Sequence, residues 1–283
     1  MNKNLFVSTT FAKDNSKISD VLSICKKNGI KQVELGSNHS YDKNCLKNLK
    51  KFKFNYLVHN YFPIPKKSFV VNIASQNRFI REKSIRHAIK AIKFCKKINA
   101  RLYTIHPGFL EDPISSNKTK KNYDFIWKKK RGYLNYSKCF ALMIYSLKRI
   151  SAFAKQNKIK IAIETEGSIK KSKLLLMQTP VEYKIFFKYF KPNEVGINLN
   201  IGHLNLSSKA FNFSRLKFFQ LIKPYLLAIE LSHNNGKEDQ HLPIKKNAWY
   251  WKILRKYKLN KTYKILEFRN TNIETIKKVS DYF

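Results

Sequence analysis

Carboxylate, amide and imidazole side chains recur along this sequence where short apolar runs end. Glu164 and Glu267 end runs that are otherwise apolar, and His59 and His106 stand at the ends of two others. Such residues are uncommon on buried strands unless they are paired or bind a metal. The full set is His59, His106, Glu164, Asn200, His203, Glu230, His233, Asp239, His241, Glu267 and Arg269. We therefore predict one functional site with acid/base or metal-dependent chemistry.

The elements that must position these side chains alternate along the chain. The apolar, β-branched runs predict strands at residues 5–9, 32–36, 55–60, 102–106, 160–165, 195–200, 228–233 and 264–268. Amphipathic stretches between them predict helices at residues 17–28, 43–51, 75–98, 133–157, 180–189, 208–221, 247–257 and 271–279. In residues 84–98, for example, apolar side chains recur at spacings of three and four, as on a helix with one buried face.

Eight strand–helix units in 283 residues match the size of a (βα)8 TIM barrel, which typically has about 250 residues. An open doubly wound sheet would be expected to carry a glycine-rich loop after its first strand, and residues 6–16 contain no glycine. We predict an α/β single-domain barrel spanning residues 1–283. The C-terminal strand ends would then form the site, and the polar, lysine-rich segment 109–132 would be a lid or loop above it.

The charge of the chain is its most unusual compositional feature. There are 57 Lys and Arg residues against 18 Asp and Glu, a formal net charge of +39. This favours anionic partners, but lysine predominates and is spread along the chain, whereas arginine is the usual residue for bidentate phosphate recognition. Four scattered cysteines, with neither a signal peptide nor an apolar span, predict a soluble, cytoplasmic protein with no membrane partner. Homo-oligomeric assembly is left open.

The strand endings resemble those of a known superfamily. The strings VHNYF, IHPGF, IETEG, GINLNIGH, ELSHNNGKEDQHLP and ILEFRN are similar to the strand ends of xylose-isomerase-like barrels. That superfamily includes sugar and sugar-phosphate isomerases and epimerases, and also endonuclease IV. The resemblance extends from the second predicted strand to the eighth. It implies the barrel fold and leaves the substrate open.

For the epimerase-like members, the resemblance implies one divalent metal held by four side chains. These fall on Glu164, Asn200, Glu230 and Glu267, with Asn in place of the usual Asp and Glu in place of the usual His; His233 lies close enough in sequence to replace Glu230. Three carboxylates and an amide oxygen suit Mn²⁺ or Mg²⁺ better than Zn²⁺. Glu164 and Glu267 would then be the catalytic acid/base pair, moving a proton next to a carbonyl through an enediolate.

The expected substrate is a small sugar or sugar phosphate. The side chains expected to bind its hydroxyl and phosphate groups are His59, His106, His203, Asp239, His241 and Arg269. The predicted function is therefore that of a sugar isomerase or epimerase.

Two alternatives stay open on the sequence alone. Endonuclease IV holds three zinc ions, and the resemblance maps its ligands onto His59, His106, Glu164, Asn200, His203, Glu230, Asp239, His241 and Glu267, of which all but Asn200 and Glu230 have the expected type. Cleavage of DNA at abasic sites is the activity that this mapping implies. The other alternative is a sugar-binding barrel without catalytic activity.

Overall fold

A closed barrel of eight parallel strands forms the centre of the computed structural model, which describes residues 4–118, 123–127, 134–167 and 174–283. The barrel strands are β1 (Leu5–Ser8), β2 (Gln32–Leu35), β3 (Asn55–His59), β4 (Leu102–Ile105), β7 (Lys160–Glu164), β8 (Gly196–Asn200), β9 (Leu226–Leu231) and β10 (Tyr263–Leu266). They pair in the order β1-β10-β9-β8-β7-β4-β3-β2. Each barrel strand thus pairs with the barrel strands that precede and follow it in the sequence, and β1 closes the barrel against β10. The predicted (βα)8 architecture is confirmed.

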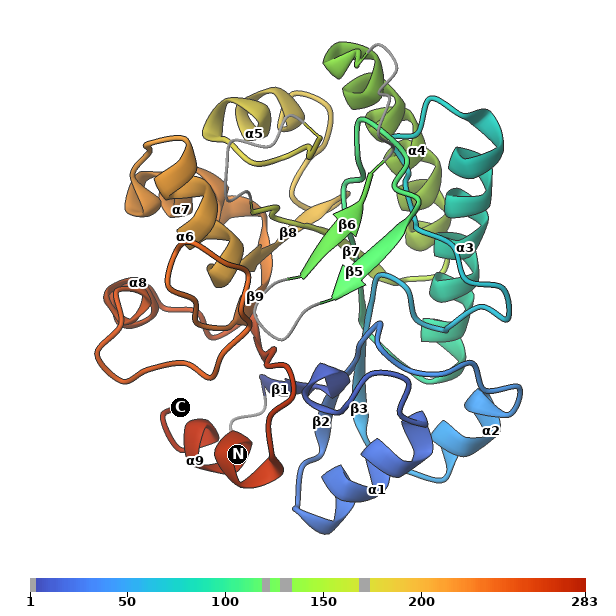
Figure 1. The fold of residues 1–283 in the computed structure, drawn as a ribbon, viewed down its shortest axis with the longest axis vertical. Coiled ribbons are helices and arrows are strands. Elements are labelled where there is room, and N and C mark those ends of the chain that lie inside the picture. Colours follow the sequence, from blue (N-terminus) through green and yellow to red (C-terminus); the bar gives the residue numbers. More distant parts are fainter. Residues whose placement is uncertain (1–3, 119–122, 128–133, 168–173) are drawn as a thin grey trace.

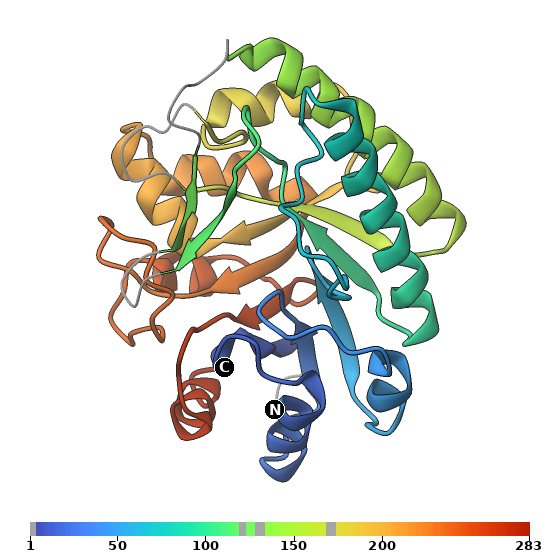
Figure 2. The same ribbon diagram turned by 45° about the vertical axis from the view of Figure 1, so that its right-hand side comes forward.

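Helices surround the barrel (Figures 1 and 2). They are α1 (Ile18–Lys27), α2 (Cys45–Lys50), α3 (Arg78–Lys97), α4 (Tyr136–Gln156), α5 (Pro180–Phe186), α6 (Ile201–Ala210), α7 (Arg215–Ile222), α8 (Tyr250–Lys256) and α9 (Ile273–Ser280), with 3₁₀ turns at Thr9–Phe11 and Lys223–Tyr225. None of the helices in the described part of the chain is long and apolar enough to cross a membrane.

Two different cores hold the strands in place. The residues that point outward, such as Val7, Val58 and Ile163, pack against the helices in the large hydrophobic core. Inside the barrel lies a smaller apolar cluster made by Phe6, Leu57, Leu102, Ala162, Ala228 and Ile265. Because side chains alternate along a strand, the next inward position on each strand lies two residues further along, at the C-terminal mouth.

Those next inward positions are polar. Two residues after Leu57 comes His59, and two residues after Ala162 comes Glu164. The same step from Ala228 and Ile265 gives Glu230 and Glu267, all buried. Side chains alternate between the two faces of every strand in the closed barrel. The candidate side chains therefore lie together in one layer, directly above the inner apolar cluster.

Two segments differ from the sequence-based prediction. The helix predicted at 208–221 is two helices, α6 and α7, separated near Asn212, whose backbone is left-handed at φ 51°. Helix α6 is buried on nearly all sides, so its sequence lacks the polar face that marks an amphipathic helix. The predicted lid segment contains an antiparallel hairpin, β5 (Ser115–Lys118) and β6 (Tyr123–Ile126), which forms a sheet of its own; residues 119–122 and 128–132 of that segment lie outside the described residues.

The loop before α5 is held by one buried carboxylate. Glu182 accepts hydrogen bonds from the backbone N–H groups of Met177, Gln178 and Thr179 at 2.6, 2.8 and 2.7 Å. The hydroxyl group of Tyr136 at the start of α4 donates to the same carboxylate at 2.6 Å. This carboxylate therefore joins α4 to α5 and fixes residues 177–179, which directly precede α5.

Glu182→Ala should lower the free energy of unfolding by about 3 kcal/mol, because buried N–H donors would lose a charged acceptor. Urea unfolding measures the change. Glu194→Ala is the matched control, since Glu194 also accepts a backbone hydrogen bond, from Lys191 at 2.7 Å, but is exposed. Its effect should stay within about 0.5 kcal/mol. Equal losses in both variants would contradict the anchoring role.

Candidate metal centre and active site

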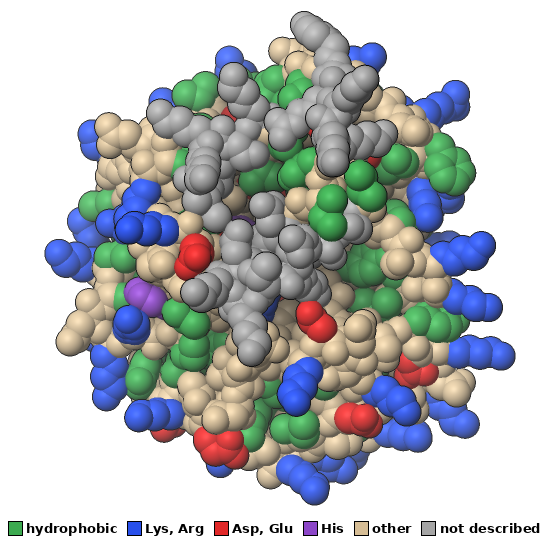
Figure 3. All heavy atoms as spheres, in the orientation of Figure 1, with side chains coloured by type: hydrophobic (Ala, Val, Ile, Leu, Met, Phe, Trp, Pro, Cys, Tyr) green, Lys and Arg blue, Asp and Glu red, His purple; other side chains and the backbone are tan. Residues whose placement is uncertain are grey.

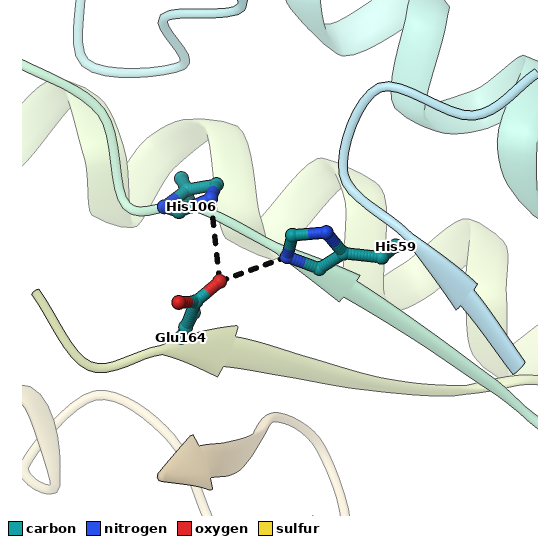
Figure 4. Close-up of side chains that lie close together, drawn as sticks. All are labelled: His59, His106 and Glu164. Carbon is teal, nitrogen blue, oxygen red and sulfur yellow. Dashed lines mark hydrogen bonds and ion pairs between the residues drawn. The ribbon is translucent and has the colours of Figure 1, made fainter. Parts of the chain in front are cut away.

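Glu164, at the end of β7, lies at the centre of the polar layer. Its Oε2 atom is 2.8 Å from Nε2 of His59 and 3.2 Å from Nε2 of His106. Figure 4 shows the two imidazole rings approaching this carboxylate from the neighbouring strands β3 and β4. We call His59, His106 and Glu164 the first cluster. One ligand atom from each residue lies within 4.8 Å of the others, which is close enough to hold one metal ion.

The His106 ring is oriented by Glu166 from the side opposite to Glu164. Its Nδ1 atom is 2.7 Å from Oε1 of Glu166, so Nε2 is left facing Glu164. A carboxylate on the far nitrogen is the usual partner of a metal-binding histidine. The side chain of His106 is 23% exposed, against 6% for His59. The first cluster therefore opens toward solvent on the side of His106.

His203, Asp239 and His241 form a second cluster, which again has two histidines and one carboxylate. Their ligand atoms also lie within 4.8 Å of one another. Oδ2 of Asp239 is 3.0 Å from Nε2 of His241 and 3.6 Å from Nε2 of His203. The Nδ1 atom of His203 is 2.7 Å from the carbonyl oxygen of Thr165, and Nδ1 of His241 is 3.1 Å from Oε2 of Glu267. Here too the outer nitrogens contact oxygens, and the Nε2 atoms face the shared carboxylate.

Between the two clusters lies the carboxamide of Asn200. Its Nδ2 atom donates to Oε1 of Glu164 at 3.0 Å, to Oε2 of Glu230 at 3.0 Å and to Oε2 of Glu267 at 3.3 Å. Its Oδ1 atom accepts from the backbone N–H of His203 at 3.1 Å, which caps helix α6. The predicted metal ligand set required the amide oxygen to face the three carboxylates. In the structure the cap turns the oxygen toward the helix and the nitrogen toward the carboxylates.

Two further predicted residues are placed by the alternation of β9. Glu230 points inward and is fully buried, whereas His233 lies three residues further, on the opposite face. The backbone of His233 pairs with Leu242, and its ring lies against Tyr250 at 6.2 Å. The His233 ring therefore lies against α8, and its role as a metal ligand stays a prediction. Arg269 lies beside the second cluster: its backbone N–H donates to the carbonyl of His241 at 3.1 Å, and its charge lowers the pKa of that histidine.

In the first cluster, the carboxylate and the imidazoles stabilise each other's charged forms. Burial would raise the pKa of Glu164, but His106, His203 and His59 together hold it well below its usual range. Burial would lower the pKa of His59, yet the hydrogen bond to Glu164 and that negative charge raise it to about 9. Without a metal, this cluster is thus a carboxylate paired with the protonated imidazole of His59.

In the second cluster, too, burial and the neighbouring charges shift the pKa values in opposite directions. Burial opposes the charge of Asp239, but His241 and His203 hold its pKa well below the usual value. Asp239 and Glu164 in turn raise the pKa of His203 well above its usual value despite burial. For His241, burial and Arg269 work against the protonated form, and Asp239 and Glu267 raise the pKa overall.

Two buried carboxyl groups behave differently. Burial, followed by the charges of Glu164 and Glu267, raises the pKa of Glu230 well above its usual range, which favours its neutral form. Glu34, on β2, is a site residue that the sequence analysis missed; burial raises its pKa to about 7, with His59 opposing. The available signal was its place as the only acid in the apolar run QVEL.

Each cluster offers two neutral imidazole nitrogens and one carboxylate once its protons are released. This donor set fits a divalent metal of the zinc type, which takes histidine and carboxylate ligands and keeps a position open for water or substrate. Hydrogen bonds on the outer nitrogens of His106 and His203 orient these rings as such ligands need, and the outer nitrogen of His241 lies 3.1 Å from Glu267.

The metal-free protein should lose stability as the pH rises from about 6.5 to about 9. His59 keeps its proton in the folded chain over this range because its pKa is about 9, whereas the unfolded chain releases it near 6.5. The contribution of this proton, up to about 3 kcal/mol, is complete below pH 6.5 and lost above pH 9. Urea unfolding in EDTA at several pH values measures it.

His59→Gln should remove this share of the pH dependence. His87 on α3 provides the control, because burial lowers its pKa to about 4 and it is neutral over the whole range. His87→Gln should therefore keep the wild-type slope. Identical slopes in the wild type and His59→Gln would contradict the pairing of His59 with Glu164.

Comparisons with known proteins agree with this architecture. An uncharacterized protein of Methanocaldococcus jannaschii is 25% identical over 278 residues, 96% of this chain and 94% of its own length. The probable endonuclease 4 of Aquifex aeolicus is 33% identical over 63 residues, 22% of this chain and 20% of that protein. A crystal structure of a D-tagatose 3-epimerase-like protein superposes with a TM-score of 0.75 at 19% identity, covering 99% of this chain and 95% of that one. Residues 22–281 match the family described as xylose isomerase-like TIM barrels, and the chain belongs to that family.

Proposed function

We propose that this protein is a metal-dependent enzyme that hydrolyses a phosphate ester of a sugar, with the abasic site of DNA as the substrate to test first. The observation that supports this most is the pair of clusters, each with two histidine Nε2 atoms directed at one carboxylate. A divalent metal bound there would activate a water molecule at neutral pH and offset the negative charge of a phosphate group.

The residues of the chain have distinct parts in this proposal. His59, His106 and Glu164 would hold one metal, and Glu166 keeps the His106 ring turned toward it. His203, Asp239 and His241 would hold another, and the Thr165 carbonyl and Glu267 fix the outer nitrogens of the two histidines. Arg269, beside His241, supplies a positive charge for a substrate phosphate.

The distribution of charge also supports an anionic substrate. Figure 3 shows Lys and Arg side chains distributed around the rim of one face of the molecule. With a net charge of +39, a field of this kind attracts a phosphate-bearing molecule over a distance of roughly 8 Å at physiological salt. The sequence similarity to endonuclease 4 of Aquifex aeolicus, although limited to a short segment, points in the same direction.

A sugar isomerase or epimerase is the second candidate. Glu164 and Glu267 lie on either side of the Asn200 amide nitrogen, at 3.0 and 3.3 Å, as an acid/base pair on two faces of a sugar would. The similarity to the D-tagatose 3-epimerase-like structure covers nearly the whole chain. We rank it second because the amide nitrogen of Asn200 faces the carboxylates that would have to hold the metal.

With zinc supplied, the protein should cleave a DNA duplex that carries one abasic site and leave the intact duplex uncut. Glu164→Gln should lower the rate by at least about 100-fold, since it removes a metal ligand, whereas Glu166→Gln should lower metal affinity by about 10- to 100-fold through the His106 ring. His87→Gln serves as the control. A zinc-loaded protein without cleavage would rule out this substrate.

If the second candidate is correct, a ketose or ketose phosphate incubated in D₂O should gain deuterium at the carbon next to its carbonyl, which NMR detects. Glu267→Gln should abolish this exchange, because one of the two proton carriers is removed. Exchange that survives in Glu267→Gln would contradict the acid/base role. Exchange absent from every ketose tested would remove this candidate.

A further inference from the structure

We propose that the amide nitrogen of Asn200 takes the place of a cation at the centre of the site. The chain would then bind metal in the first and second clusters and none between them. The inference rests on the proposed function for the two outer metals. The central position itself is argued from contacts that do not depend on those metals.

Three carboxyl groups from three different strands meet at one atom. Nδ2 of Asn200 lies 3.0 Å from Glu164, 3.0 Å from Glu230 and 3.3 Å from Glu267. Carboxylates brought this close in a buried site need a cation, a proton or a hydrogen-bond donor between them. The NH₂ group carries two donor hydrogens, which it shares among these three carboxyl groups.

The carboxamide cannot turn over without losing contacts on both sides. Its Oδ1 atom accepts from the backbone N–H of His203 at 3.1 Å. Gly202 packs against the same oxygen so closely that a Cβ atom added there would lie 3.2 Å from it. A rotation that offered Oδ1 to a metal would place NH₂ against the donor N–H of His203 and leave the helix cap unmade. The oxygen therefore remains the N-terminal cap of α6 and does not face the carboxyl groups.

A second amide on the same strand donates to the other oxygen of Glu230. Asn198, two residues earlier on β8, donates from Nδ2 to Oε1 of Glu230 at 2.6 Å. Glu230 thus receives one amide hydrogen bond on each oxygen and has no need of a metal. Its Oε1 atom also lies 3.9 Å from Nε2 of His59, so both oxygens of Glu230 already face nitrogen donors.

Asn200→Asp provides the test, because it replaces the donor by an acceptor at the same place. Wild-type protein and the variant are dialysed against buffered Zn²⁺, and zinc per chain is measured by inductively coupled plasma mass spectrometry. We expect two equivalents in the wild type and three in the variant. Without metal, the fourth carboxylate should lower the Tm by about 5 °C or more, and zinc should restore it.

Asn198→Asp is the matched control. It adds the same charge on the same face of β8, but Asn198 contacts Glu230 and Thr104 rather than three carboxyl groups. We expect no additional zinc. An equal gain in both variants would overturn the proposal, since the gain would then reflect added charge and not the central position.

Glu230→Gln is an independent variant that keeps the shape of the side chain. If Glu230 is no ligand, the zinc content should stay at the wild-type value. Loss of one equivalent would overturn the proposal.

The outcomes separate this inference from the proposed function. Two equivalents in both the wild type and Asn200→Asp would leave the outer metals in place and overturn the role of Asn200. No zinc in the wild type and one equivalent in Asn200→Asp would support the role of Asn200 and overturn the proposed outer metal sites.

Discussion

The carboxylate of Glu164 is the charge around which the polar layer of the barrel is arranged. His59 and His106 approach one of its oxygens, and Asn200 donates to the other. A buried carboxylate is stable only with such partners, so the three strands that carry them must keep their register with β7. The closed barrel provides that register because every strand is paired on both sides.

The polar layer consists of two halves that are joined by a neutral group. Each half has two histidines around a carboxylate, and the amide of Asn200 lies between them as a neutral donor. An amide donor between buried carboxylates offsets part of their mutual repulsion. The first cluster keeps solvent access through His106, whereas Glu230, Asn198 and Asn200 are fully buried.

The fold was largely predictable, since eight strand-like runs and their alternation with amphipathic stretches follow from local residue types. Helix α6 was missed because a helix buried on nearly all sides has no polar stripe to reveal its period. Glu34 was missed for a related reason: one acid in a short apolar run is conspicuous only when the inward face of the strand is known. The hairpin of β5 and β6 lay inside a segment whose composition indicated only a loop.

The sequence alone determined which residue types stand at the strand ends, and therefore that histidines and carboxylates would meet at one mouth of a barrel. The tertiary structure decided which atoms meet. Whether Glu230 or His233 faces inward depends on the register of β9, because one step along a strand exchanges its faces. Whether Asn200 offers oxygen or nitrogen to the carboxylates depends on the start of α6, because the oxygen that caps the helix cannot also face the site.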